Sequence, residues 1–281
     1  MRSIKFKQVD VFTKVPFRGN PVAVVLDGAG LAVEDMQRIA AWTNLSETTF
    51  VLPPSSPVAD YRLRIFTPRA ELPFAGHPTI GSAHAVIEAG IVMPKSGRLV
   101  QECGAGNLEL RVEGDTHWLA APAVTNTPLE DGDFFLLKKI LSSEIKKSPL
   151  IVNVGPRWLI AEMADAAAVA ALVPDMQGLA ALSNRLAIGG VTVFGASDDG
   201  RSAIHVRSFA PAHGIPEDPV CGSGNISVAA YRMANGHGGA PYVARQGMQM
   251  GRDGEVSIRY DGKKIFLGGS AVTCIDGSLQ G

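Results

Sequence analysis

Hydrophobic residues recur along this chain in two alternating patterns, one with a period of two residues and one with a period of three to four. The first pattern predicts strands at residues 4–13, 22–26, 48–52, 61–66, 98–103, 107–113 and 116–121 in the first half, and at 151–154, 158–161, 191–194, 204–209, 242–248, 255–260, 263–267 and 271–275 in the second. The second pattern predicts helices at 33–43, at 79–89, at 166–182 with a break at Pro174, and from the turn at Gly222 to about Ala234. This mixture of elements is typical of an α+β protein.

The order of elements in the first half recurs in the second half, and short stretches recur letter by letter. Asp35-Met36-Gln37 with Ala40-Ala41 reappears 140 residues later as Asp175-Met176-Gln177 with Ala180-Ala181. Arg64, Phe66, Pro68, Pro73 and Gly81 reappear 143 residues later as Arg207, Phe209, Pro211, Pro216 and Gly224. Two ordered matches at nearly the same offset, about half the chain length, indicate an internal duplication. This register places Pro78 opposite Cys221.

The duplication predicts two domains of like fold. A polar, turn-rich segment at 125–133 is the expected linker, which gives domains at 1–124 and 125–281, with the final strand free to cross to the first domain. Each domain should contain a helix that opens at a Gly- and Pro-rich turn. If the halves pack about a two-fold axis, the two helix starts face each other, and the expected site is the cleft between them.

Charge and cysteine content narrow the classes of partner and compartment. Lys and Arg number 26 against 27 Asp and Glu, so the net charge of −1 gives no reason to expect nucleic acid or an anionic membrane as a partner. The longest alanine-rich run, at 166–173, is too short to span a bilayer. Three cysteines without CxxC spacing favour a reducing compartment, and the N-terminus has no signal-peptide pattern. We therefore expect a cytoplasmic protein.

The turn from Glu217 to Asn225 opens the last helix and carries candidate chemical groups. Backbone N–H groups at a helix start suit a carboxylate or phosphate. Asp218 is either a cap of this helix or a group that contacts substrate. We interpret Glu217 as a solvated neighbour, and Cys221 as a small, half-buried residue unless it acts as a thiol.

The first half offers two further candidates. His77, in Gly76-His77-Pro78, precedes a helix whose positive dipole disfavours imidazolium, so a neutral imidazole could orient a polar substrate or cap its own helix. Glu47 follows the first helix and precedes an apolar strand with Phe50. If the Glu47 carboxylate is buried there, its pKa is raised, as a proton carrier near neutral pH requires. The same sequence position is equally compatible with an acid exposed in a loop.

Cofactor signatures are absent from the sequence. Gly104-Ala105-Gly106 and Gly251-Arg252-Asp253-Gly254 lack the third glycine or the following helix of a dinucleotide fingerprint, and there is no Walker sequence or metal-ligand cluster. An alternative chemistry pairs two thiols at facing helix starts, as in cofactor-free racemases. Cys221 would be one of them, but Cys103 lies in an alternating hairpin pattern instead of a helix start.

Several stretches together resemble the PhzF-like family of phenazine-biosynthesis isomerases and their relatives. They are Val9-Asp10-Val11-Phe12-Thr13, Pro16-Phe17-Arg18-Gly19-Asn20-Pro21, Asn44-Leu45-Ser46-Glu47-Thr48, Arg64-Ile65-Phe66-Thr67-Pro68, Gly76-His77-Pro78-Thr79, Glu217-Asp218-Pro219, Gly222-Ser223, Gln246-Gly247 and Gly251-Arg252. The resemblance spans nearly the whole chain. It implies the diaminopimelate epimerase fold, with two similar domains that are each a curved mixed sheet around a central helix.

The resemblance also implies residue roles. Glu47 would transfer the proton, His77 and Asp218 would position the substrate with Ser223, and Ser46, Gly76 and Gly222 would line the site. It implies no metal, flavin or nicotinamide, and a homodimer. The expected activity is isomerisation of a small carboxylic acid, conjugated or amino, by proton transfer between carbons. Cys221 stands where many family members have Thr, so a two-thiol racemase or epimerase remains an alternative, as does a non-catalytic small-acid binding protein.

Overall fold

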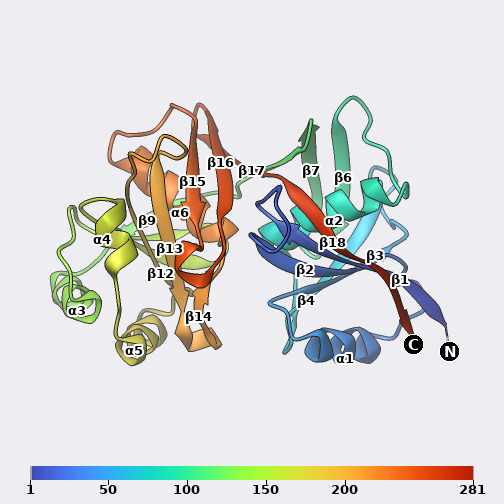
Figure 1. Ribbon diagram of the computed structural model, residues 1–281, viewed down its shortest axis with the longest axis horizontal. Coiled ribbons are helices and arrows are strands. Elements are labelled where there is room, and N and C mark those ends of the chain that lie inside the picture. The colour runs from blue at the N-terminus through green and yellow to red at the C-terminus, as the bar shows by residue number, and fades with distance from the viewer. Residues whose placement is uncertain (1, 281) are drawn as a thin grey trace. The chain divides into compact units, whose positions relative to one another are not determined.

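A computed structural model describes residues 2–280, which divide into two compact units (Figure 1). The first unit contains the chain up to Leu119 and the final segment from Gly268, and the second contains Ala120–Leu267. The expected linker at 125–133 is instead strand β9 (Thr125–Pro128) followed by the start of helix α3 (Asp131–Leu141). Both were missed because β9 is an exposed, wholly polar edge strand and α3 begins with the turn-like sequence Asp131-Gly132-Asp133.

The final strand, β18 (Ala271–Gln280), pairs antiparallel with β1 (Ser3–Val11) along the full length of β1, so the C-terminal segment is part of the first unit's sheet. The remaining strands follow in the spatial order β2, β3, β4, β6, β7 and β8. Their bounds are Asn20–Val25, Thr48–Leu52, Tyr61–Phe66, Arg98–Cys103, Gly106–Glu113 and Thr116–Ala120. The short strand β5 (Glu71–Leu72) lies beside β4.

The sheet of the second unit follows the order β9, β10, β11, β12, β13, β15 and β16. The bounds from β10 onward are Leu150–Asn153, Arg157–Glu162, Gly190–Ala196, Ile204–Ala210, Tyr242–Gln246 and Gly254–Asp261. Short β14 (Ile215–Asp218) lies beside β13, and β17 (Lys264–Gly269) leads the chain back to the first unit.

Both sheets use the same succession of pairings. From β18 to β7 the neighbouring pairs are antiparallel, antiparallel, parallel, antiparallel, parallel and antiparallel. The pairs from β9 to β16 repeat this succession. The duplication predicted from the sequence is therefore visible in the topology, with β4 corresponding to β13. The edge strand β9 begins the second unit in sequence, whereas its counterpart β18 comes from the other end of the chain.

Each unit has one helix that is buried on nearly every side. Helix α2 (Gly76–Glu88) packs against β1, β2 and β18, and nine of its residues are buried. A Cβ at Gly81 would lie 2.5 Å from the Cγ1 of Val22, so glycine allows the closest approach of helix to sheet. Helix α6 (Gly222–Ala234) packs against β10, β11 and β16 in the same way. These are the central helices that the fold class predicts, since a helix with apolar residues all round must be enclosed.

The other helices pack outside the central ones. In the first unit α1 (Val33–Thr43) covers β3 and β4; in the second, α4 (Ala166–Ala171) and α5 (Met176–Leu186) cover β12 and β13, and α3 packs against α5. As predicted, the chain between α4 and α5 breaks at Pro174. Asp165 caps α4 by accepting a hydrogen bond from the Ala168 N–H at 2.8 Å. Single 3₁₀ turns lie at Pro211–His213 and Met248–Met250.

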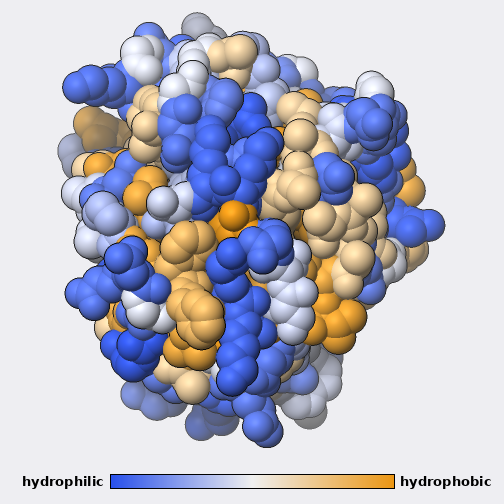
Figure 2. Space-filling view, turned by 90° about the vertical axis from the view of Figure 1, so that its left-hand side faces the viewer, coloured by the Kyte–Doolittle hydropathy of each residue, from blue (hydrophilic) through white to orange (hydrophobic). Residues whose placement is uncertain are grey.

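The face shown in Figure 2 carries hydrophilic residues with groups of hydrophobic residues between them. Within residues 2–280, no helix is long and apolar enough to cross a membrane.

The register of the internal repeat differs from the one read off the sequence. The start of α2 at Gly76 lies ten positions after Phe66, but the start of α6 at Gly222 lies thirteen positions after Phe209. The three extra residues are accommodated by the 3₁₀ turn before β14. Counted from the helix starts, Ala75 and not Pro78 is the counterpart of Cys221.

Candidate active site

Glu47 lies in the connection between α1 and β3. Helix α1 ends at Asn44, which has the left-handed backbone conformation (φ 54°) and turns the chain back toward the sheet. The carbonyl of Glu47 accepts a hydrogen bond from the Ala23 N–H at 3.4 Å, which fixes its backbone beside β2. The side chain is 15% exposed, so the sequence alternative of an exposed loop acid is wrong.

The Glu47 carboxyl lies close to the imidazole of His77. Its Oε2 lies 3.3 Å from the Nε2 of His77, and both atoms are shielded from solvent. Their alignment falls short of a hydrogen bond, and Oε2 accepts none from any other residue within 2–280. Burial raises the pKa of Glu47 to about 7, while a hydrogen bond with Ser46 acts in the opposite direction. Near neutral pH this carboxyl can both accept and donate a proton.

His77 is the second residue of α2 and is 8% exposed. The helix begins three residues earlier than the sequence pattern indicated, with Ala75 at the N-cap position and Pro78 within the first turn, where proline is tolerated. The imidazole is thus inside the first turn and faces Glu47, an arrangement suited to orienting a group near that carboxyl. Gly76 leaves space beside it, because a Cβ there would meet no atom within 4 Å.

In the second unit, Cys221 and not Asp218 caps the central helix. The Sγ of Cys221 accepts a hydrogen bond from the Gly224 N–H at 3.3 Å. Asp218 instead accepts a hydrogen bond from the Val220 N–H at 3.0 Å, and its backbone carbonyl accepts one from the side chain of Gln246. The interpretation of Asp218 as a cap of α6 was therefore wrong, and its carboxylate stabilises the turn that precedes the helix.

Ser223 occupies the same helical position in α6 that His77 occupies in α2. Its Oγ accepts a hydrogen bond from the indole Nε1 of Trp158 at 3.0 Å and lies 3.6 Å from the Sγ of Cys221. Trp158, on β11, was not among the residues that the sequence singled out. It lies 65 residues from Ser223, and no local pattern connects the two.

The turn before α6 is also held from β15. The side-chain oxygen of Gln246 accepts hydrogen bonds from the Cys221 N–H at 3.2 Å and from the Asn225 amide at 2.9 Å. Gly247, which follows Gln246, adopts a φ of 98°, and a Cβ there would lie 2.5 Å from the carbonyl oxygen of Pro219. The Gln246-Gly247 pair thus supports the backbone of the turn.

The thiols are poorly suited to proton transfer. Burial raises the pKa of Cys221 well above its usual range, and the charge of Asp218 adds to this effect. Cys103 lies in the β6–β7 hairpin, as predicted, and burial raises its pKa too. A proton-carrying thiol requires a lowered pKa. The counterpart of Cys221 at the start of α2 is Ala75, so the two central helices do not present a pair of thiols.

An arginine clamp holds the loop before each central helix. Arg64 makes a bidentate ion pair with Glu71, at 2.7 and 2.6 Å, and its guanidinium stacks on Phe66. Arg207 pairs in the same way with Glu217, both distances being 2.9 Å, and stacks on Phe209. The sequence repeat contained both Arg-x-Phe pairs but not their partners. Glu217 is therefore not a solvated neighbour of Asp218, because Arg207 holds its carboxylate in place.

The structure thus groups the predicted residues by unit. Glu47, Ser46, Gly76 and His77 lie together in the first, and Asp218, Gly222 and Ser223 lie together in the second, at the start of the corresponding helix. Within residues 2–280, no three His, Cys, Asp or Glu side chains form a cluster that could hold a metal ion.

Comparison with known proteins shows the family of this chain. Residues 9–277 match the family model described as phenazine biosynthesis-like protein, PhzC-PhzF. The chain is 40% identical over 294 residues to antisense-enhancing sequence 1 of Schizosaccharomyces pombe, and 99% of each protein is covered. It is 34% identical over 284 residues to the trans-2,3-dihydro-3-hydroxyanthranilate isomerase of Pseudomonas chlororaphis, which covers 96% of this chain and 97% of the relative.

Solved structures of related proteins have the same fold as this chain. A PhzF family protein of Bacillus anthracis superimposes with a TM-score of 0.89 at 26% identity, with the whole of both chains covered. A hydroxyproline epimerase of Agrobacterium vitis superimposes with a TM-score of 0.61 at 16% identity, over 99% of this chain and 93% of the other, which shows a shared fold. The fold is therefore the two-domain diaminopimelate epimerase-like fold that the sequence predicted. The chain belongs to the phenazine biosynthesis-like PhzC-PhzF family and is an isomerase of that family.

Proposed function

We propose that this isomerase moves a proton between two carbons of a small carboxylic acid without a cofactor, and that Glu47 carries the proton. The observation that carries the proposal is the buried Glu47 carboxyl, whose pKa is raised to about 7 and whose Oε2 lies 3.3 Å from the Nε2 of His77. A carboxyl with a pKa near the working pH balances the tendency to accept a proton against the tendency to return it.

The proposed reaction has two steps. The Glu47 carboxylate removes a proton from one carbon of the substrate, and the electron pair of the broken C–H bond shifts into the conjugated system. The resulting carboxylic acid then donates its proton to a second carbon as the double bond moves, and Glu47 returns to its starting state. One carboxyl can serve both steps because it becomes the acid after acting as the base.

His77 would orient the substrate next to Glu47. From the first turn of α2, its imidazole can hydrogen-bond to a polar group of the substrate, and the positive end of the helix favours the negative charge that develops after proton removal. Ser46 would tune the Glu47 carboxyl through its hydrogen bond, and Gly76 would leave room for the substrate.

For the second unit, the proposed roles rest on the family resemblance. Asp218 would position the substrate, and Ser223 with the backbone of Gly222 would hold its carboxylate at the start of α6. The Trp158–Ser223 and Gln246–Cys221 hydrogen bonds support these roles, because they fix the groups that would contact the ligand.

The names of the relatives support a proposal for the substrate class. Several proteins 34% identical to this chain are trans-2,3-dihydro-3-hydroxyanthranilate isomerases, whose named substrate is a cyclic amino acid with conjugated double bonds. We propose a conjugated or amino carboxylic acid for this chain as well. We further propose a homodimer, which the mass from light scattering on a sizing column would test.

A screen of small unsaturated and amino carboxylic acids in D₂O tests the proposal, with trans-2,3-dihydro-3-hydroxyanthranilate included. Mass spectrometry and NMR would detect isomerised product and solvent deuterium on its carbons. We expect exchange with at least one compound, reduced at least about 100-fold in Glu47→Gln. The matched control Glu34→Gln changes an exposed acid of α1 and should keep full activity. Saturable binding of a compound without any exchange would instead favour the non-catalytic small-acid binding protein.

A further inference from the structure

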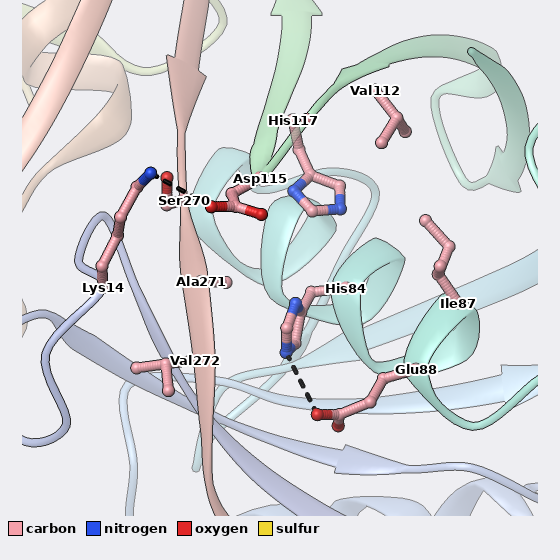
Figure 3. Close-up of a pocket in the computed structure, with 11 residues that line it drawn as sticks. Lys14, His84, Ile87, Glu88, Val112, Asp115, His117, Ser270, Ala271 and Val272 are labelled. Carbon is pink, nitrogen blue, oxygen red and sulfur yellow. Dashed lines mark hydrogen bonds and ion pairs between the residues drawn. The ribbon is translucent and has the colours of Figure 1, made fainter.

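A pocket lies at the other end of α2 from His77. Its cavity volume is about 330 Å³, and it is lined by the last turns of α2, the β7–β8 turn, the start of β18 and the loop after β1 (Figure 3). Glu88 lies eleven positions after His77 in α2, which corresponds to a rise of about 16 Å along the helix. The pocket is therefore separate from the Glu47–His77 pair, although it belongs to the same unit.

His117, on β8, is a buried side chain with an unused polar atom in this pocket. The residue is 4% exposed, and its Nδ1 makes no hydrogen bond to any residue within 2–280. Burial lowers the pKa of His117 to about 4, so the ring is neutral at physiological pH. Figure 3 shows this ring on the side of the pocket that faces His84 and Asp115. An imidazole nitrogen in such a position is a ready partner for a ligand.

The hydrogen-bond partners of His84 determine which of its nitrogens is free to accept. The Thr273 hydroxyl donates its single hydrogen to the Oε2 of Glu88 at 2.6 Å. The contact of 3.3 Å between Thr273 Oγ1 and His84 Nε2 therefore requires Nε2 to carry the hydrogen. Burial lowers the pKa of His84, so its Nδ1 is a bare acceptor. Figure 3 shows that nitrogen on the side of Asp115 and His117.

The charges around the pocket leave acceptors in excess. Lys14 is paired with Asp115 at 3.1 Å, and Lys7 is paired with both Glu88 and Asp276 at 2.8 and 2.7 Å. These two cations and three carboxylates sum to −1. The Oε1 of Glu88 lies 3.9 Å from Nε2 of the neutral His84 ring. The excess negative charge and the His84 Nδ1 acceptor suit a ligand that brings its own hydrogens and a positive charge.

Apart from Ser270, the rest of the lining is apolar. Ile87, Val112 and Val272 contribute aliphatic side chains to the pocket wall. A cavity of this size accommodates a small organic molecule. A metal ion does not fit the same groups as they are arranged, because they form no metal-binding cluster among the described residues.

We propose that this pocket is a second ligand site, and that it binds a small molecule with a protonated primary amine on a short aliphatic body. The ammonium group donates hydrogen bonds to His84 Nδ1 and His117 Nδ1 and is attracted by the Glu88 and Asp115 carboxylates, and the aliphatic body packs against Ile87, Val112 and Val272. The site is independent of the proposed chemistry at Glu47, since none of its groups takes part in that reaction.

Histidine ring NMR tests the proposal on the full chain. With ¹⁵N-labelled histidine, n-butylammonium is titrated into the protein, and n-butanol and butyrate are titrated in parallel. We expect saturable shifts of the His84 and His117 ring nitrogens with n-butylammonium and much weaker effects with the uncharged and anionic analogues. Equal responses to butyrate, or no response of either ring, would overturn the proposal. So would displacement of n-butylammonium by Mg²⁺, because it would indicate a metal site.

Two variants link the binding to the carboxylates. Glu88→Gln should weaken n-butylammonium binding by about fivefold, as expected for a partly exposed charge pair. Because Glu88 also pairs with Lys7, Asp115→Asn at the exposed rim is a second variant, with a smaller expected loss in the same direction. Glu109→Gln, on the exposed face of β7, is the matched control and should bind as the unchanged protein does. Unchanged affinity in both pocket variants would contradict the proposal.

Discussion

Replacing Glu47 by glutamine should stabilise the protein while removing its proposed activity. The carboxyl is buried beside His77, and its ionised form is disfavoured there because it has lost most of its hydration. Glutamine has nearly the same shape and no charge. The substitution therefore relieves the cost of burying a carboxylate at any pH at which Glu47 is ionised in the unfolded chain.

The magnitude follows from the pKa of Glu47 in the two states. Its pKa rises from 4.5 to about 7 on folding. A group whose folded-state pKa is raised binds its proton more tightly in the folded state. The contribution of Glu47 to the free energy of unfolding is therefore fully present below pH 4.5 and is lost as pH rises toward 7. At 1.36 kcal/mol per pKa unit, the full loss is about 3 kcal/mol. Glu47→Gln should thus raise the free energy of unfolding by about 3 kcal/mol at pH 8 but by about 1 kcal/mol at pH 5.

Urea unfolding at both pH values, followed by tryptophan fluorescence and circular dichroism, measures this difference. The two probes also show whether the two units unfold together, which a two-state treatment requires. Glu34→Gln serves as the control, because an exposed acid should show no comparable pH-dependent gain. A Glu47→Gln protein that is less stable than the unchanged protein at pH 8, or equally affected at pH 5 and pH 8, would refute the reasoning.

Three further predictions follow from charged or titratable groups. If Glu47 is the base, kcat/KM for exchange should rise with pH through about 7 and then level off, and a profile flat from pH 5.5 to 8.5 would count against it. Because the pKa of His117 falls from 6.5 to about 4 on folding, the protein should lose about 3 kcal/mol of stability as pH drops across that interval, and His117→Gln should reduce this acid sensitivity in urea titrations. Arg207→Met should lower the free energy of unfolding by about 3 kcal/mol or more, because it leaves the Glu217 carboxylate buried without its partner. Arg18→Met, at an exposed position, is the comparison. An equal loss of stability in the two variants would argue against the clamp.

Helices and strands were predicted well from the sequence where the hydrophobic pattern ends at the same residue as the element. Helix α1 and strands β3 and β4 have the predicted bounds, because turn residues flank each of them. The polar strand β9 and helix α3 were missed, since β9 is stabilised by pairing with β10 and not by an alternating pattern of its own. The half-length repeat was recognised, but its register shifted by three residues where the 3₁₀ turn lengthens one loop.

In the candidate site, too, contacts between distant segments could not be predicted from the sequence. The burial of Glu47 was one of two readings that its position after α1 left open, because burial depends on side chains that pack around it from distant segments. Glu217 was misread because its partner Arg207 lies across a turn, ten residues away. The hydrogen bond from Trp158 to Ser223 and the cap provided by Cys221 likewise depend on tertiary contacts, which no residue spacing reveals. Residue types thus indicated where the site lies, and the packed structure showed how its groups are held.

The central claim is that Glu47 and not Cys221 carries the proton, and solvent deuterium exchange in two variants tests it most directly. With a compound that the unchanged protein isomerises, we expect Glu47→Gln to lose at least about 100-fold in exchange rate and Cys221→Ser to stay within about tenfold of the unchanged protein. Serine is a good N-cap residue, so α6 should keep its cap in the second variant. An inactive Cys221→Ser beside an active Glu47→Gln would contradict the account.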